Sequence, residues 1–172
     1  MEKPLIHLAG CDALEIPAEE EAVALSDITV TQDELIAYAL SVRPLYDSLG
    51  RLTGQLAGLL LLAQVRGRFD ADLEAVTTPR ERARECAERI QSIHPPKGAA
   101  RRHWALRRAM SIVTEVTQQL SNPKSKPEQV REQVAAWTDQ LKRANALVRW
   151  AADASLGLNP IDFSQACCCC NG

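Results

Sequence analysis

Apolar residues recur every three or four positions through four long stretches of the chain, and polar residues fill the positions between them. The longest stretch runs from residue 32 to residue 66 and keeps this spacing without a break. Its apolar positions are Leu35, Tyr38, Val42, Leu45, Leu49, Leu52, Leu56, Leu59 and Ala63. The pattern predicts one long helix capped by Thr31, with Glu34 completing a capping box. Pro44 removes one backbone donor, so a kink near Arg43 is expected.

Three further stretches have the same periodicity and predict helices at about residues 78–95, 98–120 and 127–155. The first of these has Thr78 as its N-cap, with Pro79 at the first helical position, where proline is favoured. Short connectors join the four segments, which predicts an all-α fold, an antiparallel four-helix-type bundle. The residues expected in its core include Leu52, Leu56, Leu141 and Val148.

Composition agrees with this fold, since 46% of the 172 residues are hydrophobic but only 4% are aromatic, few for a sandwich or barrel. Charge is unevenly distributed along the chain. Residues 1–34 hold nine acidic residues and one basic residue, whereas residues 78–108 hold nine basic and three acidic residues. We therefore divide the chain into an acidic N-terminal arm (1–30), a helical bundle (31–157) and a flexible tail (158–172).

Signatures of catalysis or cofactor binding are missing from the chain, which has no G-x-G-x-x-G, P-loop, H-E-x-x-H, G-x-S-x-G or E-x-x-H motif. Three histidines lie in unrelated contexts and are expected at surface or capping positions: His7, His94 and His103. Cys86 falls on an apolar stripe, which predicts a buried, unreactive thiol. The most apolar run, residues 56–63, is far shorter than the ~20 residues that span a bilayer. A cytoplasmic, non-enzymatic protein without an evident cofactor is the resulting expectation.

Gly50, Gly54 and Gly58 form the first of two constellations that carry candidate function. Glycine inside a helix costs about 0.8–1 kcal/mol relative to alanine, so three glycines on one stripe indicate a use. They create a groove in which a second backbone can approach closely. Close packing against another helix of the same bundle is the preferred interpretation. A homodimer crossing is the next, and a membrane-inserted state is the third.

Four consecutive cysteines near the C-terminus form the second constellation, and they are Cys167, Cys168, Cys169 and Cys170. Exposed thiols oxidise and cross-link, so such a run in a soluble protein indicates a purpose. Adjacent cysteines do not converge on one zinc ion as C-x-x-C loops do, but a soft metal such as Cu(I) stays open. Two other uses fit better: S-acylation, which would tether the bundle to a membrane, and modification by a partner enzyme that docks on the bundle. A tail without function is the remaining alternative.

Residues 97–108 are strongly basic and contain four candidates for anion binding. These are Arg101, Arg102, Arg107 and Arg108. Trp104 lies among them, where it can stack on a nucleic-acid base or pack at the bundle edge. The acidic residues of the preceding segment are alternative partners for the arginines: Glu81, Glu85 and Glu88. A pI near 5.9 argues against strong nucleic-acid binding.

Together these patterns favour a non-catalytic interaction or adaptor protein whose C-terminal cysteine cluster is the reactive element. The main alternative is a precursor or substrate protein whose cysteines are modified by a partner enzyme, with the bundle as docking domain. The second alternative is nucleic-acid binding through residues 97–108. We expect a protein partner or a modifying enzyme. A homo-oligomer fits the glycines, and membrane contact requires lipidation of the tail.

Overall fold

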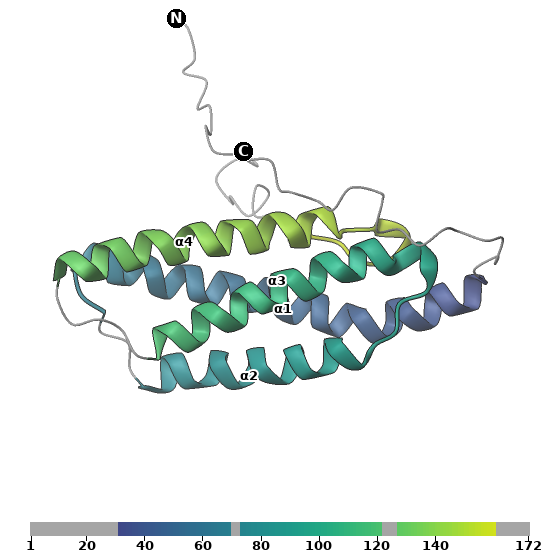
Figure 1. Cartoon of the computed structure of the whole chain (residues 1–172), viewed down its shortest axis with the longest axis horizontal. Helices are drawn as coiled ribbons and strands as arrows, with labels where there is room; N and C mark the ends of the chain where they lie inside the picture. The colour runs from purple at the N-terminus through teal and green to yellow at the C-terminus, as the bar shows by residue number, and fades with distance from the viewer. Residues whose placement is uncertain (1–30, 70–72, 122–126, 161–172) are drawn as a thin grey trace, which may run out of the picture.

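Four long helices make up most of the computed structural model (Figure 1), which describes residues 31–69, 73–121 and 127–160. They are α1 (Gln32–Arg66), α2 (Leu73–Ser92), α3 (Ala100–Leu120) and α4 (Pro127–Trp150). Two short 3₁₀ helices accompany them, η2 (Lys97–Ala99) before α3 and η3 (Ala154–Leu156) after α4. Within these described ranges there is no β-strand, and the predicted all-α bundle is confirmed.

The N-terminus of α1 has the predicted capping box. The Glu34 backbone N–H donates to the Thr31 hydroxyl at 3.3 Å, and the Thr31 N–H donates to the Glu34 carboxylate at 3.0 Å. The helix continues through Pro44 as one element, because this proline lies on the exposed side, where water can hydrate the carbonyl that loses its donor. It ends at Gly67, whose φ of 65° is a left-handed conformation that favours glycine.

The N-terminus of α2 differs from the prediction, since the helix begins at Leu73 and not after Thr78. Pro79 therefore lies inside the helix, where it lacks the N–H that would bond the carbonyl of residue 75. The additional turn places Val76 in the core at 8% exposure, and the burial of this side chain offsets the missing hydrogen bond. The predicted cap at Thr78 was wrong because sequence signals for a helix start were outweighed by packing.

The C-terminus of α4 also differs, because the helix ends at Trp150 and not near residue 155. The chain then folds back in a turn that two backbone hydrogen bonds of 2.9 Å close, one in each direction between Asp153 and Leu158. Gly157 permits this turn with a φ of 68°. Leu158 is fully buried, so a residue assigned to the tail from the sequence belongs to the core.

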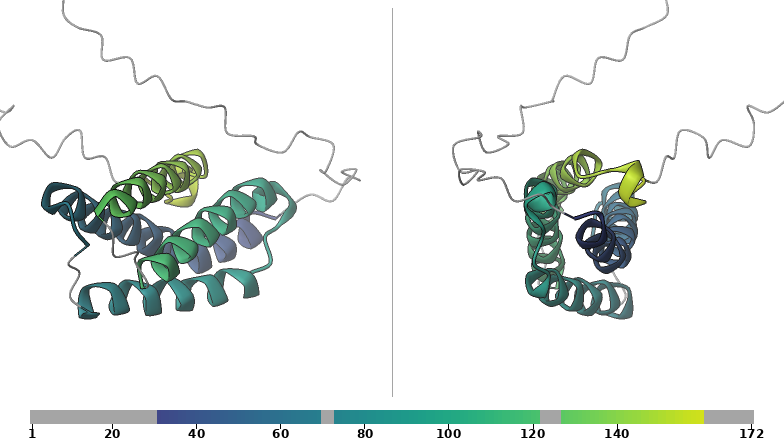
Figure 2. Two further views of the ribbon diagram at one scale, coloured as in Figure 1. Left: turned by 60° about the vertical axis from the view of Figure 1, so that its left-hand side comes forward. Right: turned by 90° about the vertical axis from the view of Figure 1, so that its right-hand side faces the viewer.

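Each helix runs antiparallel to the one before it, and the four enclose a single apolar core (Figures 1 and 2). α1 packs against α2 and α4, and α3 packs against the same two helices from the other side. α1 therefore has one side toward the core and an opposite side that no other long helix covers, although the turn at Gly157 lies against Arg43 at its edge (Figure 2, right). Four residues predicted for the core are confirmed there at 0–5% exposure: Leu52, Leu56, Leu141 and Val148.

Candidate interaction surface

Large apolar side chains are exposed along the side of α1 that points away from the core. Ile36, Leu40, Leu61, Leu62 and Val65 are 48–78% exposed, although the same helix buries eleven residues on its other side. We call the strip made by residues 36, 40, 43, 47, 50, 51, 54, 58, 61, 62 and 65 the outer face of α1. Most of these positions follow one another at intervals of three or four residues, which places them on one side of a helix.

Gly54 and Gly58 are exposed in the middle of the outer face, and Gly50 beside them is half-buried. A Cβ atom added to Gly54 or Gly58 would meet no atom of another helix within 4 Å. The interpretation that the glycines let another helix of the bundle approach closely was therefore wrong at these two positions. The leucine seam on the opposite side of α1 makes the contacts with the core instead. The homodimer interpretation stays a prediction.

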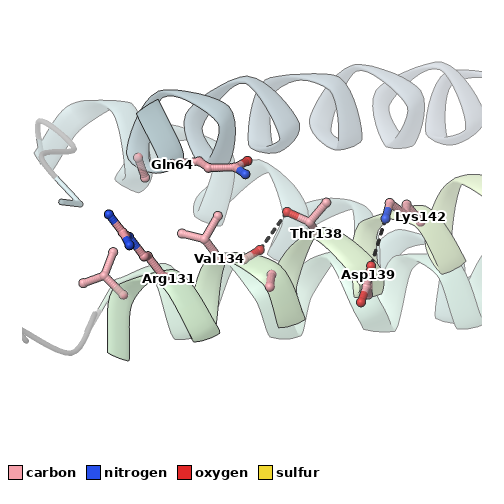
Figure 3. A pocket seen from close by; sticks show the side chains of 9 residues that line it. Gln64, Arg131, Val134, Thr138, Asp139 and Lys142 are labelled. Atoms are coloured by element: carbon pink, nitrogen blue, oxygen red, sulfur yellow. Dashed lines mark hydrogen bonds and ion pairs between the residues drawn. The ribbon is translucent and has the colours of Figure 1, made fainter. Parts of the chain in front are cut away.

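A groove of about 620 Å³ lies between α1 and α4, next to the outer face (Figure 3). Its lining consists of Ala63, Gln64, Val130, Arg131, Val134, Ala135, Thr138, Asp139 and Lys142. Two of its charged groups pair with each other, since Lys142 Nζ donates to Asp139 Oδ1 at 3.0 Å. Gln64 on the α1 side lies about 100° around the helix from the exposed Val65, so this groove borders the outer face without including any of its residues.

The basic cluster of α3 is divided between two sides of the helix. Arg102 forms an ion pair of 3.0 Å with Asp153, so it fastens the C-terminal turn to α3 and does not pair with the acidic residues of α2. Hydrogen bonds from Ser155, aided by the charge of Arg102, hold the pKa of Asp153 below its ordinary value. Arg102 thus has a structural role in the bundle.

Arg107 and Arg108 lie on the other side of α3, where they line an open cleft of about 580 Å³ between α2 and α3. Trp104 lines the same cleft at 40% exposure, as expected for a residue at the bundle edge. Glu115 also lines it and brings a negative charge beside the two arginines. Arg101 is exposed two turns before Arg108 on the same side of the helix and does not line the cleft. A phosphate chain would therefore meet a short and mixed patch, which is a weak electrostatic footprint for nucleic acid.

His103 is buried in the core, and the expectation of a surface or capping position was wrong. Its Nδ1 lies 3.3 Å from the Tyr38 hydroxyl. When the ring proton is on the other nitrogen, that N–H donates to the Ile90 carbonyl and the Tyr38 hydroxyl donates to Nδ1. Burial, reinforced by the positive charge of Arg107, lowers the pKa of His103, and burial raises the pKa of Tyr38 to about 12. The three-residue spacing of His103 from buried Leu106 was the sequence signal for this position.

Cysteine and metal chemistry is limited in the part of the chain that the structure describes. Cys86 is buried as predicted, and burial raises the pKa of its thiol. Residues 167–170, the predicted thiol site, lie outside the described residues. Among residues 31–69, 73–121 and 127–160, no three His, Cys, Asp or Glu side chains are grouped to hold a metal ion. None of the helices described there is long and apolar enough to cross a bilayer.

Five of the seven large apolar side chains exposed in the described residues belong to the outer face of α1, and the other two are Trp104 and Trp150. This face was not predicted from the sequence, because the heptad spacing of α1 marks its buried seam more strongly than its second apolar stripe. In comparisons with known proteins, no family model, curated protein or solved structure matches the chain.

Proposed function

We propose that the chain is a non-catalytic interaction protein that binds a protein partner through the outer face of α1. The observation that carries this proposal is the exposure of five large apolar side chains on one side of one helix. Apolar surface contributes about 25 cal/mol for each Å² removed from water, so a contact that covers these side chains is favourable. The five side chains form two apolar groups at the two ends of the outer face, with charged residues between them. Apolar surface with a polar border is typical of protein–protein interaction sites.

The rigid mounting of α1 supports the same function. Leu52 and Leu56 are buried in the core on the opposite side of the helix, and the contact of Tyr38 with His103 joins its N-terminal part to α3. A partner therefore meets a surface whose backbone is already ordered, and association costs little conformational entropy in α1. Arg131 and Lys142 in the neighbouring groove add charged groups that can select the partner.

Native-source extracts test this proposal through the size of the assembly that contains the protein. We expect the wild-type chain to elute above its own mass of 18.9 kDa. A chain with both Leu61→Lys and Val65→Lys should elute at the monomer position, because two charges on the outer face prevent the partner's apolar surface from desolvating there. Both side chains are exposed, so the melting temperature of the purified variant should stay unchanged.

Glu81→Lys is the matched control, since it places the same charged side chain at an exposed position of α2. The control should keep the wild-type elution position. Wild-type protein that elutes at 18.9 kDa, or a double variant that elutes with the wild type, would contradict the proposal.

The C-terminal cysteines favour a second role as a modification site that is compatible with the first. Its support is the run of four adjacent thiols at residues 167–170. Unprotected thiols oxidise and cross-link, so four of them together indicate that the cysteines have a chemical use. Intact mass spectrometry of the protein from its native source tests this role. Acylation, enzymatic modification or a retained soft metal changes the mass of the chain, whereas an unmodified mass would contradict it.

A further inference from the structure

Four of the five large apolar residues of the outer face are arranged symmetrically about the middle of α1, and Leu62 is the exception. Ile36 and Val65 have their midpoint between residues 50 and 51, and Leu40 and Leu61 have the same midpoint. All four side chains are exposed. When a second copy of the helix is laid alongside in the reverse direction with this midpoint as centre, each of these four residues meets an apolar residue of the other copy. Such self-complementarity is the requirement for an interface with two-fold symmetry.

The charged residues between these ends obey the same symmetry. Arg43 mirrors Gly58 and Asp47 mirrors Gly54, so each charged side chain of one copy faces a glycine of the other. The space beside Gly54 and Gly58 is open, and it can receive the side chain of a second copy. Asp47 faces Gly54 of the second copy, and Arg51 of that copy lies three residues from this glycine. At about 1.5 Å per residue, Asp47 and this Arg51 are about 4.5 Å apart along the helix axis.

A parallel pair in register also matches the apolar residues, because each meets its own copy, but it lacks the favourable placement of the charges. It places Arg43 against Arg43 and Asp47 against Asp47 of the other copy, and like charges in contact are unfavourable. The antiparallel pair also brings the two Arg51 side chains together, about 1.5 Å apart along the axis, but each of them has an aspartate of both copies within reach to offset the repulsion. Charge complementarity therefore selects a second copy in the reverse direction.

We propose that a second copy of this chain binds the outer face of α1 in antiparallel orientation, with the two-fold axis beside Gly50. This inference rests on the proposed function and names its partner. Between residues 36 and 65 the helix rises about 44 Å, and a contact strip about 10 Å wide then buries roughly 900 Å² over both copies. Stable complexes bury about 1,200–2,000 Å², so we expect a weak and reversible dimer.

Sedimentation of the purified full-length chain over a micromolar concentration series tests the proposal, with a reducing agent present to keep the cysteines from cross-linking. The mass should rise from 18.9 kDa toward twice that value. Leu40→Glu and Leu61→Lys should each weaken the association at least tenfold, because each variant places two charges against leucines of the other copy. The control Glu81→Lys should associate like the wild type.

An equimolar mixture of the Leu40→Glu and Leu61→Lys chains tests the orientation. A mixed antiparallel pair has one contact between opposite charges and one contact between two leucines, so the mixture should recover association that neither variant has alone. In a parallel pair each introduced charge would face an unchanged leucine, and the mixture would recover nothing. Recovery supports the proposal and the absence of recovery overturns it.

The outcomes separate this inference from the function on which it rests. A wild-type chain that remains at 18.9 kDa throughout the series overturns self-association. If the native assembly still depends on Leu61 and Val65 in that case, the interaction function stands and its partner is a different protein. If the native chain is also monomeric, both proposals fail.

Discussion

Replacing Leu56 by alanine removes most of a side chain that is 1% exposed on the buried seam of α1. The same seam continues through Leu52 and Leu60, which are also buried, and α2 and α4 pack on either side of the helix. These rigid neighbours can fill the space left by the lost atoms only in part, so a cavity term adds to the loss of burial. Leucine-to-alanine changes in cores cost about 3–5 kcal/mol, and we expect Leu56→Ala to fall in this range.

Urea unfolding followed by circular dichroism measures the effect. With a slope of about 2 kcal/mol per molar urea, a loss of about 4 kcal/mol lowers the midpoint by about 2 M. Leu62→Ala is the matched control, because the same change occurs six residues later at a position that is 53% exposed. The control should lose less than about 0.5 kcal/mol. Equal losses for the two variants would refute the assignment of the buried and outer sides of α1.

Further urea titrations test other parts of the structure. Tyr46→Phe should leave stability unchanged or raise it, because the buried Tyr46 hydroxyl has no hydrogen-bond partner among the described residues. Tyr38→Phe should cost about 1 kcal/mol, because it removes the hydrogen bond to His103. A larger loss of stability for Tyr46→Phe than for Tyr38→Phe would contradict this. Burial lowers the pKa of His103 in the folded chain, so the unfolded chain takes up a proton there at a higher pH. The free energy of unfolding should therefore fall as pH drops through about 6.5. A His103→Gln chain whose stability falls just as steeply over this pH range would refute this. Gly54→Ala should stabilise the dilute protein by up to about 1 kcal/mol, since the added methyl group meets no other helix, and destabilisation would show a hidden contact.

The helices and the core could be predicted from the sequence because a spacing of three and four residues specifies which side of a helix is apolar. The seam residues and the capping box at Thr31 follow from local rules of this kind, and both are confirmed. The start of α2 at Leu73 and the turn that buries Leu158 could not be predicted in this way. Both depend on the burial of one apolar side chain in the core, Val76 in the first case and Leu158 in the second, and the sequence pattern does not show this packing.

The candidate surface was predicted only in part. The spacing of Gly50, Gly54 and Gly58 showed that they share one stripe, but spacing alone does not show on which side of a helix its neighbours lie. The structure places Gly54 and Gly58 on the outer side, among exposed apolar residues. The periodicity that marks the buried seam also contains a second stripe, which includes Leu61 and Val65. The outer face was therefore encoded in the sequence as this second stripe.

A distance measurement across the proposed dimer tests the central claim, that the outer face of α1 binds a second copy. A spin label introduced at residue 62 through a non-cysteine side chain avoids the native thiols. In the antiparallel pair the two labels lie 23 residue steps apart along the axis, so pulsed electron paramagnetic resonance should find a distance of about 35 Å. A distance of about 10 Å, the separation of parallel helices in contact, or no distance between chains at concentrations above the micromolar range, would contradict the claim.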